Sequence, residues 1–481
     1  MADIKFGTSG WRAIIGEDFT FENVRLVTQA IADYVKGLRI KDKGLSQKLP
    51  AQRLEQIVVG YDTRFLSKEF ALESAKVLSA NKIRVLLTDR DAPTPVIAYH
   101  IIKSRCAGGI NFTASHNPPE YNGIKFSPET GGPAGPQVTK EIEKNIAKLQ
   151  KKRTLVFKPN EKLIKLFNPQ PAYLKQIEKM INFKDIKRAK LKIALDCLYG
   201  TSRDYLDTIL KKYGYEPIVL HDYLNPYFDG KRPEPAPENI EELIAIVKKK
   251  RLHLGIATDG DADRFGIIDR DGTYITPNQV VVLLFYHLLQ TRPPTRKKVA
   301  RTVATTHMID AIANKHNIES IETPVGFKYF VDLINEGDCI IAGEESGGLS
   351  ISGHLPEKDG ILACLLATEM VAIQRRSLRS ILNSLYKKYG EFYSDKIDLD
   401  ISLPNKARLM KKLRLPSFKS FAGLRVEKRD FRDGCKFYLK KESWILFRPS
   451  GTEPIVRIYF ESKSKKRLIA IRKAAERISR V

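Results

Sequence analysis

The sequence predicts an α/β protein that is built from several similar blocks. Short apolar runs rich in β-branched residues recur along the chain, and each is followed by a polar or glycine-bearing turn and then by a helical pattern. The length of 481 residues is enough for roughly three or four domains. Strands that alternate with helices favour sheets whose functional loops follow the carboxyl ends of the strands.

The expected elements follow one another in a repeating order. Near the amino end, apolar residues from Val24 to Tyr34 recur at helical spacing, and Gly37 is expected to end this helix. Further helices are expected over Glu69–Ala80 and Ile361–Tyr386, and a last one carries Leu468, Ile471, Ala475 and Ile478 on one face. The expected strands are Ile57–Gly60, Ile83–Leu87, Gly109–Phe112, Lys192–Asp196, Leu254–Thr258, Val299–Thr305, Cys339–Gly343, Trp444–Phe447 and Ile455–Phe460.

Three polar stretches suggest where the domains meet. They are the lysine-rich run Glu141–Lys165, the tight turn Arg270–Thr273 and the stretch Lys387–Lys396. We therefore expect domains over residues 1–153, 154–273, 274–387 and 388–481. The first three have the character of similar α/β blocks and the fourth that of a smaller cap, with no short repeat of the solenoid type.

The composition argues against several classes of protein. The five cysteines lie far apart without a CxxC pair, which argues against a disulfide framework and a cysteine zinc site. The amino end has no apolar core of a signal peptide. The longest apolar stretch, Val280–Leu289, is about half of what a bilayer crossing needs. We expect a soluble, cytoplasmic protein with no membrane partner.

The charge is unusual, because 82 basic and 56 acidic residues give a formal net charge of +26. Such an excess attracts nucleic acid, anionic membranes or acidic metabolites. The basic residues are spread along the chain, without a basic stripe interleaved with aromatic residues. We expect a solvated basic surface that also favours anionic substrates.

The first loop that carries chemistry is Thr113–Pro118, directly after an expected strand. Ser115 in this loop is able to accept a phosphate covalently if its surroundings stabilise the phosphoryl group in transfer. The alternative is a polar turn in which Ser115 or Asn117 caps a short helix.

The second loop holds three alternating carboxylates, Asp259, Asp261 and Asp263. Their mutual repulsion is compensated if they share a cation. A calcium loop of the EF-hand type is excluded, because Arg264 stands at its sixth position and Arg270 at its twelfth. The pattern fits Mg²⁺ held by protein and phosphate oxygens, and an ordinary Asp-Gly turn is the alternative.

The third and fourth loops have the character of binding sites. The third, Gly343–Gly348, offers paired carboxylates and a hydroxyl for vicinal sugar hydroxyls. The fourth, Arg448–Pro454, forms an anion cradle with the following Arg457, because guanidinium binds phosphate through two hydrogen bonds. Either loop is alternatively a structural turn. A Walker A loop, a Rossmann fingerprint and an HExxH zinc motif are not evident in the sequence.

These four loops and their order resemble the α-D-phosphohexomutase superfamily, the phosphoglucomutase/phosphomannomutase enzymes. The resemblance extends from Phe6–Arg12 to Arg448–Arg457, nearly the whole chain. It implies three topologically similar α/β domains and a smaller α+β, TATA-binding-protein-like C-terminal domain, arranged around a central cleft. It agrees with the block pattern found in the sequence.

The resemblance also implies roles for individual residues. Ser115 corresponds to the family's phosphoserine, and its phosphate joins Asp259, Asp261 and Asp263 as a ligand of Mg²⁺. Lys125 corresponds to the general acid/base, for which a depressed pKa is needed near neutrality. The sugar ligands are Glu344 and Ser346, and the distal phosphate clamp is Arg448, Ser450, Gly451 and Thr452. Further active-site positions are Arg12, His116, Arg264, Lys328 and His354.

The implied activity is the interconversion of glucose 1-phosphate and glucose 6-phosphate, with glucose 1,6-bisphosphate as intermediate and activator. Glu345 and Gly348 stand where phosphoglucosamine mutases typically carry glutamine and histidine, which favours glucose. Phosphomannomutase or phosphoglucosamine mutase activity is the alternative within the family, and phosphopentose a more distant one. A nucleic-acid-binding protein on a mutase scaffold is the alternative from another class. We expect a phosphosugar as partner and a monomer or a homodimer.

Overall fold

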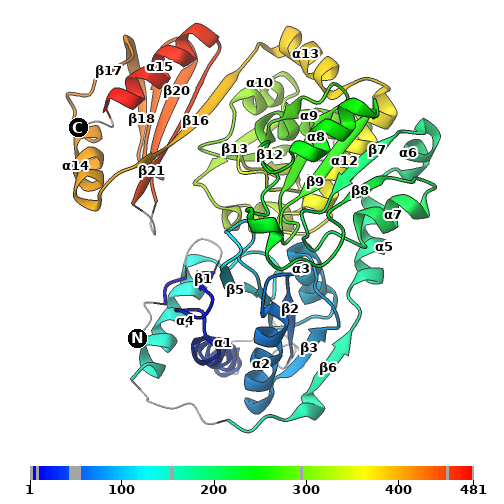
Figure 1. Ribbon diagram of the computed structural model, residues 1–481. Helices are drawn as coiled ribbons and strands as arrows, with labels where there is room; N and C mark the ends of the chain where they lie inside the picture. The colour runs from blue at the N-terminus through cyan, green and yellow to red at the C-terminus, as the bar shows by residue number, and fades with distance from the viewer. Residues whose placement is uncertain are drawn as a thin grey trace.

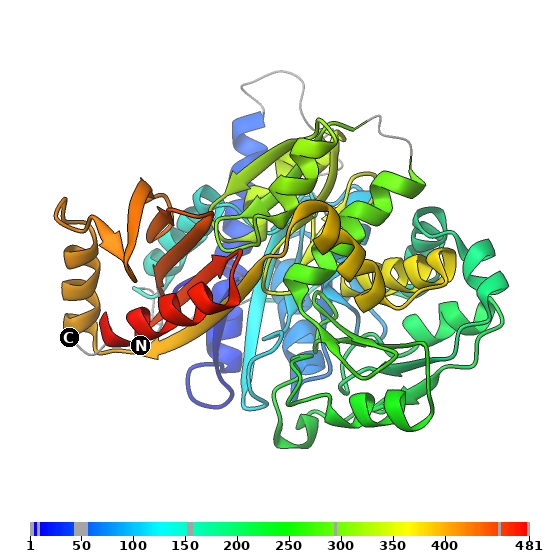
Figure 2. The same ribbon diagram turned by 90° about the horizontal axis from the view of Figure 1, so that it is seen from above.

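The computed structural model describes residues 4–6, 10–42, 56–151, 157–292, 296–450 and 454–478, and its described strands form four sheets. Figure 1 shows the first block at the bottom, the next two at the upper right and the C-terminal block at the upper left. In Figures 1 and 2, β16 runs from the end of α13 to the C-terminal sheet.

The first sheet has the order β1-β5-β4-β2-β3-β6. Strands β2, β3, β4 and β6 are parallel, whereas β5 is antiparallel to β4 and β1 is antiparallel to β5. The strands are β1 (Trp11–Ile14), β2 (Gln56–Tyr61), β3 (Arg84–Thr88), β4 (Gly108–Phe112), β5 (Tyr121–Pro128) and β6 (Ile164–Phe167). The helices are α1 (Phe21–Asp42), α2 (Ser67–Ala80), α3 (Thr94–Lys103) and α4 (Pro136–Leu149).

The second sheet repeats this plan in the order β11-β10-β9-β7-β8. Its strand β9 pairs with β7 in parallel and with β10 in an antiparallel hairpin, as β4 does with β2 and β5. The strands are β7 (Ile193–Asp196), β8 (Ile218–Leu220), β9 (Leu254–Thr258), β10 (Phe265–Asp269) and β11 (Tyr274–Ile275). The helices are α5 (Gln170–Met180), α6 (Phe183–Ala189), α7 (Leu206–Lys212) and α8 (Glu241–Lys249).

The third sheet, in the order β13-β12-β14-β15, follows the same plan around β14. Its strands are β12 (Lys298–Thr302), β13 (Glu319–Thr323), β14 (Cys339–Gly343) and β15 (Leu349–Ile351). Its helices are α9 (Pro277–Thr291), α10 (Met308–Lys315), α11 (Val331–Asn335), α12 (Gly360–Gln374) and α13 (Leu378–Tyr389). The topological similarity of the first three blocks is therefore confirmed.

The C-terminal sheet is different, because its six strands are joined by antiparallel pairs in the order β16-β21-β20-β19-β18-β17. The strands are β16 (Tyr393–Asp400), β17 (Ser420–Phe421), β18 (Leu424–Asp430), β19 (Cys435–Leu439), β20 (Ser443–Pro449) and β21 (Ile455–Ser462). Two helices accompany them, α14 (Leu403–Leu413) and α15 (Lys465–Ile478). The expected smaller α+β domain is confirmed.

The core of the second and third blocks is shared and is built around α12. Every residue of α12 from Gly360 to Ala372 is buried. The helix packs on β9, β10 and β15 and on helices α6 and α9. A helix that is apolar on all sides is typical of such an interior position. Its amino end is capped by Asp359, whose carboxylate accepts a hydrogen bond from the Leu362 amide at 2.9 Å.

The expected strands are all present, with ends shifted by a few residues, but two predictions about helices were wrong. Helix α1 continues through Gly37 to Asp42, because packing against α2 and α4 outweighs the cost of about 1 kcal/mol for a helical glycine. The expected helix over Ile361–Tyr386 is two helices, since Arg375 adopts a left-handed φ of 51° and Ser377 caps α13. The domain boundaries remain predictions; β6 lies beyond residue 153 and pairs with β3.

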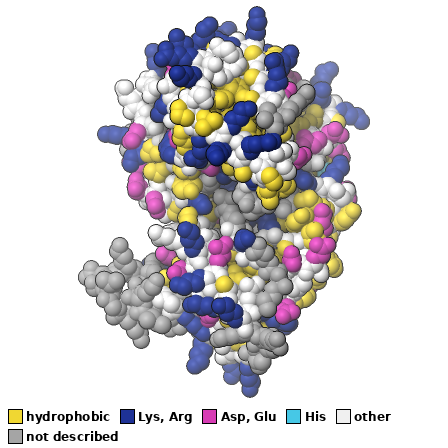
Figure 3. All heavy atoms as spheres, turned by 90° about the vertical axis from the view of Figure 1, so that its left-hand side faces the viewer, with side chains coloured by type: hydrophobic (Ala, Val, Ile, Leu, Met, Phe, Trp, Pro, Cys, Tyr) yellow, Lys and Arg dark blue, Asp and Glu magenta, His cyan; other side chains and the backbone are white. Residues whose placement is uncertain are grey.

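The cysteines, the helices and the surface charge bear on the expectations from composition. All five cysteines are buried free thiols. None of the helices in the described part of the chain has both the length and the apolar character to cross a membrane. Figure 3 shows lysine and arginine side chains scattered over one whole face, interleaved with apolar and acidic groups.

A buried ionic network joins the third and fourth blocks. Glu322 in β13 accepts hydrogen bonds from Lys436 at 2.8 Å and from Arg432 at 2.6 Å, both in the fourth block, and from Arg301 at 2.7 Å in its own block. Burial opposes ionisation of Glu322, but Lys436 and Arg301 outweigh it and lower the Glu322 pKa to about 2. Trp444 lies with its ring 4.5 Å from the Lys436 ammonium.

We expect Glu322→Gln to weaken this interface by about 3–5 kcal/mol at pH 7, because it leaves buried cations without their counter-charge. The Glu322 pKa is below its ordinary 4.5, so its stabilisation is complete above about pH 4.5 and is lost as the pH falls toward 2. The variant should therefore approach the parent protein in acid. Urea unfolding followed by Trp444 fluorescence in a Trp11→Phe background measures both effects.

The matched control is Glu442→Gln, since Glu442 forms an exposed ion pair with Lys463 within the fourth block. It should change stability by less than about 0.5 kcal/mol. Equal midpoints for Glu322→Gln and its parent at pH 7 would show that the network does not hold the two blocks together.

Candidate active site

The four loops singled out in the sequence have the same place in the fold, since each connects two antiparallel strands of a hairpin. They join β4 to β5, β9 to β10, β14 to β15 and β20 to β21. In the first three blocks the loop follows the carboxyl end of a strand that pairs in parallel with its other neighbour. This is the position where α/β sheets hold functional residues.

Ser115 is buried and has a left-handed backbone, with a φ of 52°. This conformation is uncommon for a residue with a side chain and is found at functional turns. The Ser115 hydroxyl donates a hydrogen bond to Asp259 Oδ2 at 2.7 Å, across 144 positions of the sequence. The serine loop and the aspartate loop therefore meet at their functional side chains.

The three aspartates form a buried cluster in which one ligand atom of each lies within 4.8 Å of the others. Asp261 Oδ1 and Asp263 Oδ1 are buried oxygen atoms without a hydrogen-bond partner. Burial and repulsion from Asp261 and Asp263 raise the Asp259 pKa well above its ordinary value. Unpaired carboxylate oxygens that repel one another are the donor set that a hard cation such as Mg²⁺ takes.

Close backbone packing holds the two loops together. A Cβ at Gly260 would lie 2.9 Å from the Ser115 carbonyl oxygen, so a larger residue there would push the loops apart. At Gly360, where α12 begins, a Cβ would lie 2.2 Å from the Arg264 carbonyl oxygen. The Gly360 amide also donates to the Ala262 carbonyl at 3.0 Å. The aspartate loop thus rests on the amino end of α12.

Two lysines neutralise the aspartate cluster. Lys125 of β5 lies 2.6 Å from Asp261 Oδ2 and 3.1 Å from Asp263 Oδ2, and Lys358 lies 3.2 Å from Asp263 Oδ2. Burial disfavours the charge of Lys125, but Asp261 and Asp263 outweigh it and raise the Lys125 pKa. In this structure the Lys125 pKa is therefore raised and not depressed, and its ammonium stays charged.

Three other expected residues surround this cluster. Arg12 of β1 donates to the Asn117 side chain in the serine loop at 2.8 Å. His116 Nδ1 lies 3.4 Å from Ser115 Oγ, and burial together with the charges of Arg264 and Arg12 lowers the His116 pKa well below its ordinary value. Arg264 donates its amide to Asp259 Oδ1 at 2.9 Å and pairs with Glu234.

Glu344 follows β14 and is buried, with its Oε1 accepting the Gly326 amide at 3.0 Å. Burial and repulsion from Glu345 raise the Glu344 pKa to about 7. The Lys358 charge opposes this shift, so Lys358 connects the third loop electrostatically to the aspartate loop. Ser346 is half-buried in the same turn.

The fourth loop is preceded by Arg448, which pairs with Asp433 at 2.9 Å. Asp433 also accepts the Val325 amide at 2.8 Å, so it joins the fourth block to the third. The Lys328 pKa is lowered by burial and by the nearby Arg448. Two cations that repel each other at an inter-domain position suit a polyanionic ligand.

The remaining expected residues of this loop are placed as follows. Ser450 is buried and its carbonyl accepts the Lys406 ammonium at 2.8 Å. Arg457 in β21 lies 4.0 Å from Asp398. Gly451 and Thr452 lie outside the described residues.

His354 is hydrogen-bonded to the aspartate that caps α12. Its Nε2 is 2.6 Å from Asp359 Oδ2, which also accepts the Tyr173 hydroxyl at 2.7 Å. In the described part of the chain, His354 is hydrogen-bonded to this capping aspartate and not to Ser115 or the three aspartates. His354 therefore helps to hold Asp359 in place as the cap at the amino end of α12.

Three residues of the site were missed by the sequence reasoning. Lys358 lies next to the capping Asp359, Asp433 holds Arg448, and Arg64 contacts the backbone of the serine loop. Arg64 stands in the polar turn after an expected strand, Tyr61–Arg64, which was the available signal. Lys358 stands four residues after His354, in a stretch that the family resemblance includes, whereas Asp433 stands in a segment without an informative pattern.

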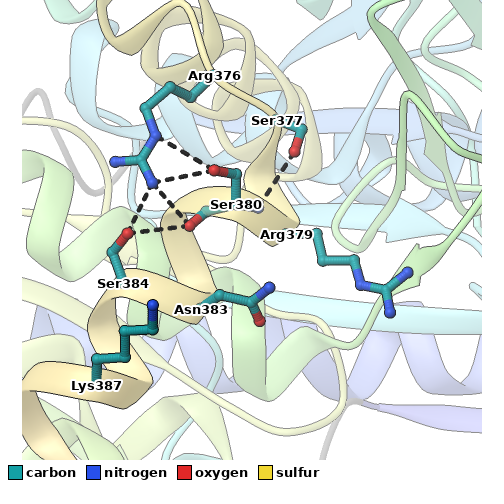
Figure 4. A pocket seen from close by; sticks show the side chains of 7 residues that line it. All are labelled: Arg376, Ser377, Arg379, Ser380, Asn383, Ser384 and Lys387. Carbon is teal, nitrogen blue, oxygen red and sulfur yellow. Dashed lines mark hydrogen bonds between the residues drawn. The ribbon is translucent and has the colours of Figure 1, made fainter.

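A separate hollow of about 410 Å³ lies on the outer surface of α13. In Figure 4 its Arg376 points back to the helix, where it donates to the Ser380 carbonyl at 2.9 Å and to the Ser384 hydroxyl at 2.7 Å. Arg376 and the serines of the hollow thus bond to one another, and none of the residues that line it belongs to the serine or aspartate loop.

Four family models match the chain, each described as phosphoglucomutase/phosphomannomutase. Alpha/beta/alpha domain I matches residues 3–153, domain II matches 171–272, domain III matches 276–389, and the C-terminal domain matches 407–478. Together they account for most of the sequence in the order of the four sheets.

Individual proteins agree with this result but differ in the sugar that they name. A phosphoglucomutase of Komagataeibacter xylinus is 29% identical, over 98% of this chain and 90% of that protein. A probable phosphoglucosamine mutase of Methanopyrus kandleri is 27% identical, over 97% and 96%. The crystal structure of a putative phosphomannomutase from Thermus thermophilus superposes with a TM-score of 0.84 at 29% identity, and each chain is fully covered.

The raised pKa of Glu344 makes a testable prediction. Below pH 4.5 the carboxyl is neutral whether the chain is folded or not, and between pH 4.5 and 7 it ionises only in the unfolded chain. The protein should therefore lose up to about 3 kcal/mol relative to Glu344→Gln across this interval. Denaturant unfolding at several pH values measures the difference.

An exposed carboxylate of the same block, Glu336, provides the control, since Glu336→Gln should change stability by less than about 0.5 kcal/mol. A difference between the parent and Glu344→Gln that stays constant from pH 4.5 to 8 would contradict the burial of an uncompensated carboxyl.

Proposed function

Because this chain belongs to the phosphoglucomutase/phosphomannomutase family, an enzyme family of the isomerase class, we propose that it moves a phosphate between two positions of a hexose with Ser115 as carrier. The observation that carries this proposal is the contact of the Ser115 hydroxyl with Asp259, at the edge of a buried three-carboxylate cluster. A nucleophile next to an acidic cluster with unpaired carboxylate oxygens suits metal-assisted phosphoryl transfer.

The residues proposed to hold Mg²⁺ are Asp259, Asp261 and Asp263, with the phosphate of Ser115 as a further ligand. Their unpaired oxygens fit this assignment. When bound, the ion would neutralise phosphate charge and stabilise the charge that develops in the transition state.

In the proposed first step, the bond between phosphorus and Ser115 Oγ breaks while phosphorus bonds to a sugar hydroxyl oxygen. Lys125 is suited to give a proton to Ser115 Oγ, because its carboxylate partners keep it charged. The proton that the sugar hydroxyl loses passes to Lys125, so that the lysine is charged again at the end of the step. The product is a hexose 1,6-bisphosphate. It reorients in the site by exchanging its two ends, and its other phosphate is then transferred to Ser115.

The groups proposed to bind the sugar phosphate lie on the other two loops. Glu344 and Ser346 are assigned to the sugar hydroxyls, and Arg448, Lys328, Ser450, Gly451, Thr452 and Arg457 to the distal phosphate. Repulsion between Lys328 and Arg448 in the absence of a ligand supports an anion site. Because both orientations of the bisphosphate must fit, the clamp should recognise phosphate more than the ring.

Glucose is our proposed sugar, on the strength of Glu345 and Gly348 in the third loop. Mannose and glucosamine phosphates are the alternatives, since relatives of similar identity carry all three names. The protein is further proposed to act in the cytoplasm, as a monomer or a homodimer with the four domains given above.

The choice of sugar is tested by offering the 1-phosphates of glucose, mannose and glucosamine in parallel coupled assays with Mg²⁺. We expect kcat/KM to be at least tenfold higher for glucose 1-phosphate. A preference for either other sugar would reject the glucose assignment while leaving the mutase intact. No turnover of any of them, together with salt-dependent DNA or RNA binding, would favour the nucleic-acid-binding alternative.

The carrier role of Ser115 is tested by Ser115→Ala. The parent protein, incubated with glucose 1,6-bisphosphate, should gain one phosphate in its intact mass, and the variant should gain none. Turnover should fall at least 10³-fold, because alanine removes the hydroxyl that lies on Asp259 and is proposed to carry the phosphate. Near-normal turnover by the unphosphorylated variant would remove the covalent carrier.

A further inference from the structure

We propose that Arg64 is a positioning residue that holds the serine loop in its left-handed turn, so that the Ser115 hydroxyl faces Asp259. The inference rests on the proposed function, in which this hydroxyl carries phosphate. Arg64 lies in the loop after β2 and does not contact the Ser115 hydroxyl itself. Its action on the reaction is therefore through the backbone.

Both terminal nitrogens of Arg64 donate hydrogen bonds to the serine loop and the first residue of β5. Its Nη2 donates to the carbonyl oxygens of Ser115 at 2.7 Å and Asn117 at 2.6 Å. Its Nη1 donates to the carbonyl oxygens of Pro118 at 2.7 Å and Tyr121 at 3.0 Å. Both terminal nitrogens of the guanidinium are thus fully used by one loop, whose carbonyl oxygens turn inward to meet it.

Arg64 is itself held rigidly from two sides. Its side chain is fully buried, and its Nε lies 3.3 Å from Asp62 Oδ2. Asp62 Oδ1 accepts the Arg64 amide at 2.9 Å and the Ser67 hydroxyl at 2.7 Å. On the other side, the guanidinium lies 5.1 Å from the centre of the Phe228 ring, which belongs to the second block. Arg64 therefore spans the boundary between the block of Ser115 and the block of the aspartates.

The loop needs such a support for two reasons. A left-handed φ is unfavourable at a residue with a side chain unless its surroundings compensate. Without Arg64, the carbonyl oxygens that turn inward would also lose the four hydrogen bonds that it donates to them in a buried site. The Arg64 charge additionally lies behind a serine that is proposed to carry a dianion.

Arginine is required because of its geometry. The planar guanidinium presents four terminal N–H groups in a fixed fork, whereas lysine has three donors at a single point on a shorter, flexible chain. A lysine in this place keeps the charge but reaches fewer of the carbonyl oxygens. The substitution Arg64→Lys therefore separates positioning from charge.

The experiment compares the full-length protein with three variants. Arg64→Lys removes the fork, and Ser67→Ala weakens the Asp62 anchor without changing Arg64. The matched control is Arg429→Lys, since Arg429 also donates to three loop carbonyls, those of Leu415, Pro416 and Phe418, but in the C-terminal block. Each variant is measured for hydrogen–deuterium exchange of the peptide 113–118 and for kcat and KM with glucose 1-phosphate.

For Arg64→Lys we expect exchange of residues 113–118 to be at least tenfold faster, kcat at least 50-fold lower and KM within threefold of the parent. Ser67→Ala should shift exchange and kcat in the same direction by about three- to tenfold. Arg429→Lys should leave both unchanged. If Arg64→Lys does not fold, the graded effect in Ser67→Ala decides.

Unchanged exchange of residues 113–118 in folded Arg64→Lys would overturn the inference, as would a loss of kcat matched by an equal rise in KM. In Ser67→Ala, exchange and kcat both equal to the parent would do the same. Failure of the proposed function is distinguishable, because it appears as absent turnover in the parent protein. The exchange measurement still tests the hold of Arg64 on the loop in that case.

Discussion

Three buried carboxylates on one short loop are the constraint on which the rest of the site depends. Asp259, Asp261 and Asp263 lie too close together to be ionised without positive charge beside them. The fold supplies part of that charge from three directions, with Lys125 from β5, Lys358 from the turn before α12 and Arg264 from the loop itself. Asp261 Oδ1 and Asp263 Oδ1 are left without a hydrogen-bond partner, so the cluster is able to take one more cation.

The repeated hairpin explains how such distant residues meet. In each of the first three blocks the functional loop follows a buried strand, and the strand after the loop pairs antiparallel with the strand before it. Both ends of the loop are therefore fixed in the sheet. The amino end of helix α12 then connects two of these loops. Its first residue, Gly360, packs on the aspartate loop, and its capping residue, Asp359, directly follows Lys358, whose charge acts on Glu344. The ionic network around Glu322 sets the fourth block against the third, where Arg448 and Lys328 lie.

Much of this was predictable from the sequence, and the remainder has physical reasons. Apolar β-branched runs that end in polar loops identified the strands, and the aspartate spacing identified the acidic cluster. The helix end at Gly37 was misplaced because packing overrides a weak propensity. His354 is hydrogen-bonded to Asp359, and its expected catalytic role stays a prediction. Arg64 was missed because it binds backbone carbonyl oxygens. Every residue has a carbonyl oxygen, so this contact leaves no pattern in the sequence of the serine loop.

The central claim is that the three aspartates and the Ser115 oxygen share one divalent cation. It is tested most directly by the anomalous diffraction of crystals soaked in Mn²⁺. We expect one strong peak within about 2.3 Å of an oxygen of each of Asp259, Asp261 and Asp263 and next to Ser115 Oγ or its phosphate, with Lys125 displaced from Asp261. Crystals in which Lys125 keeps its contacts with Asp261 and Asp263, with no anomalous peak at the cluster, would contradict the account.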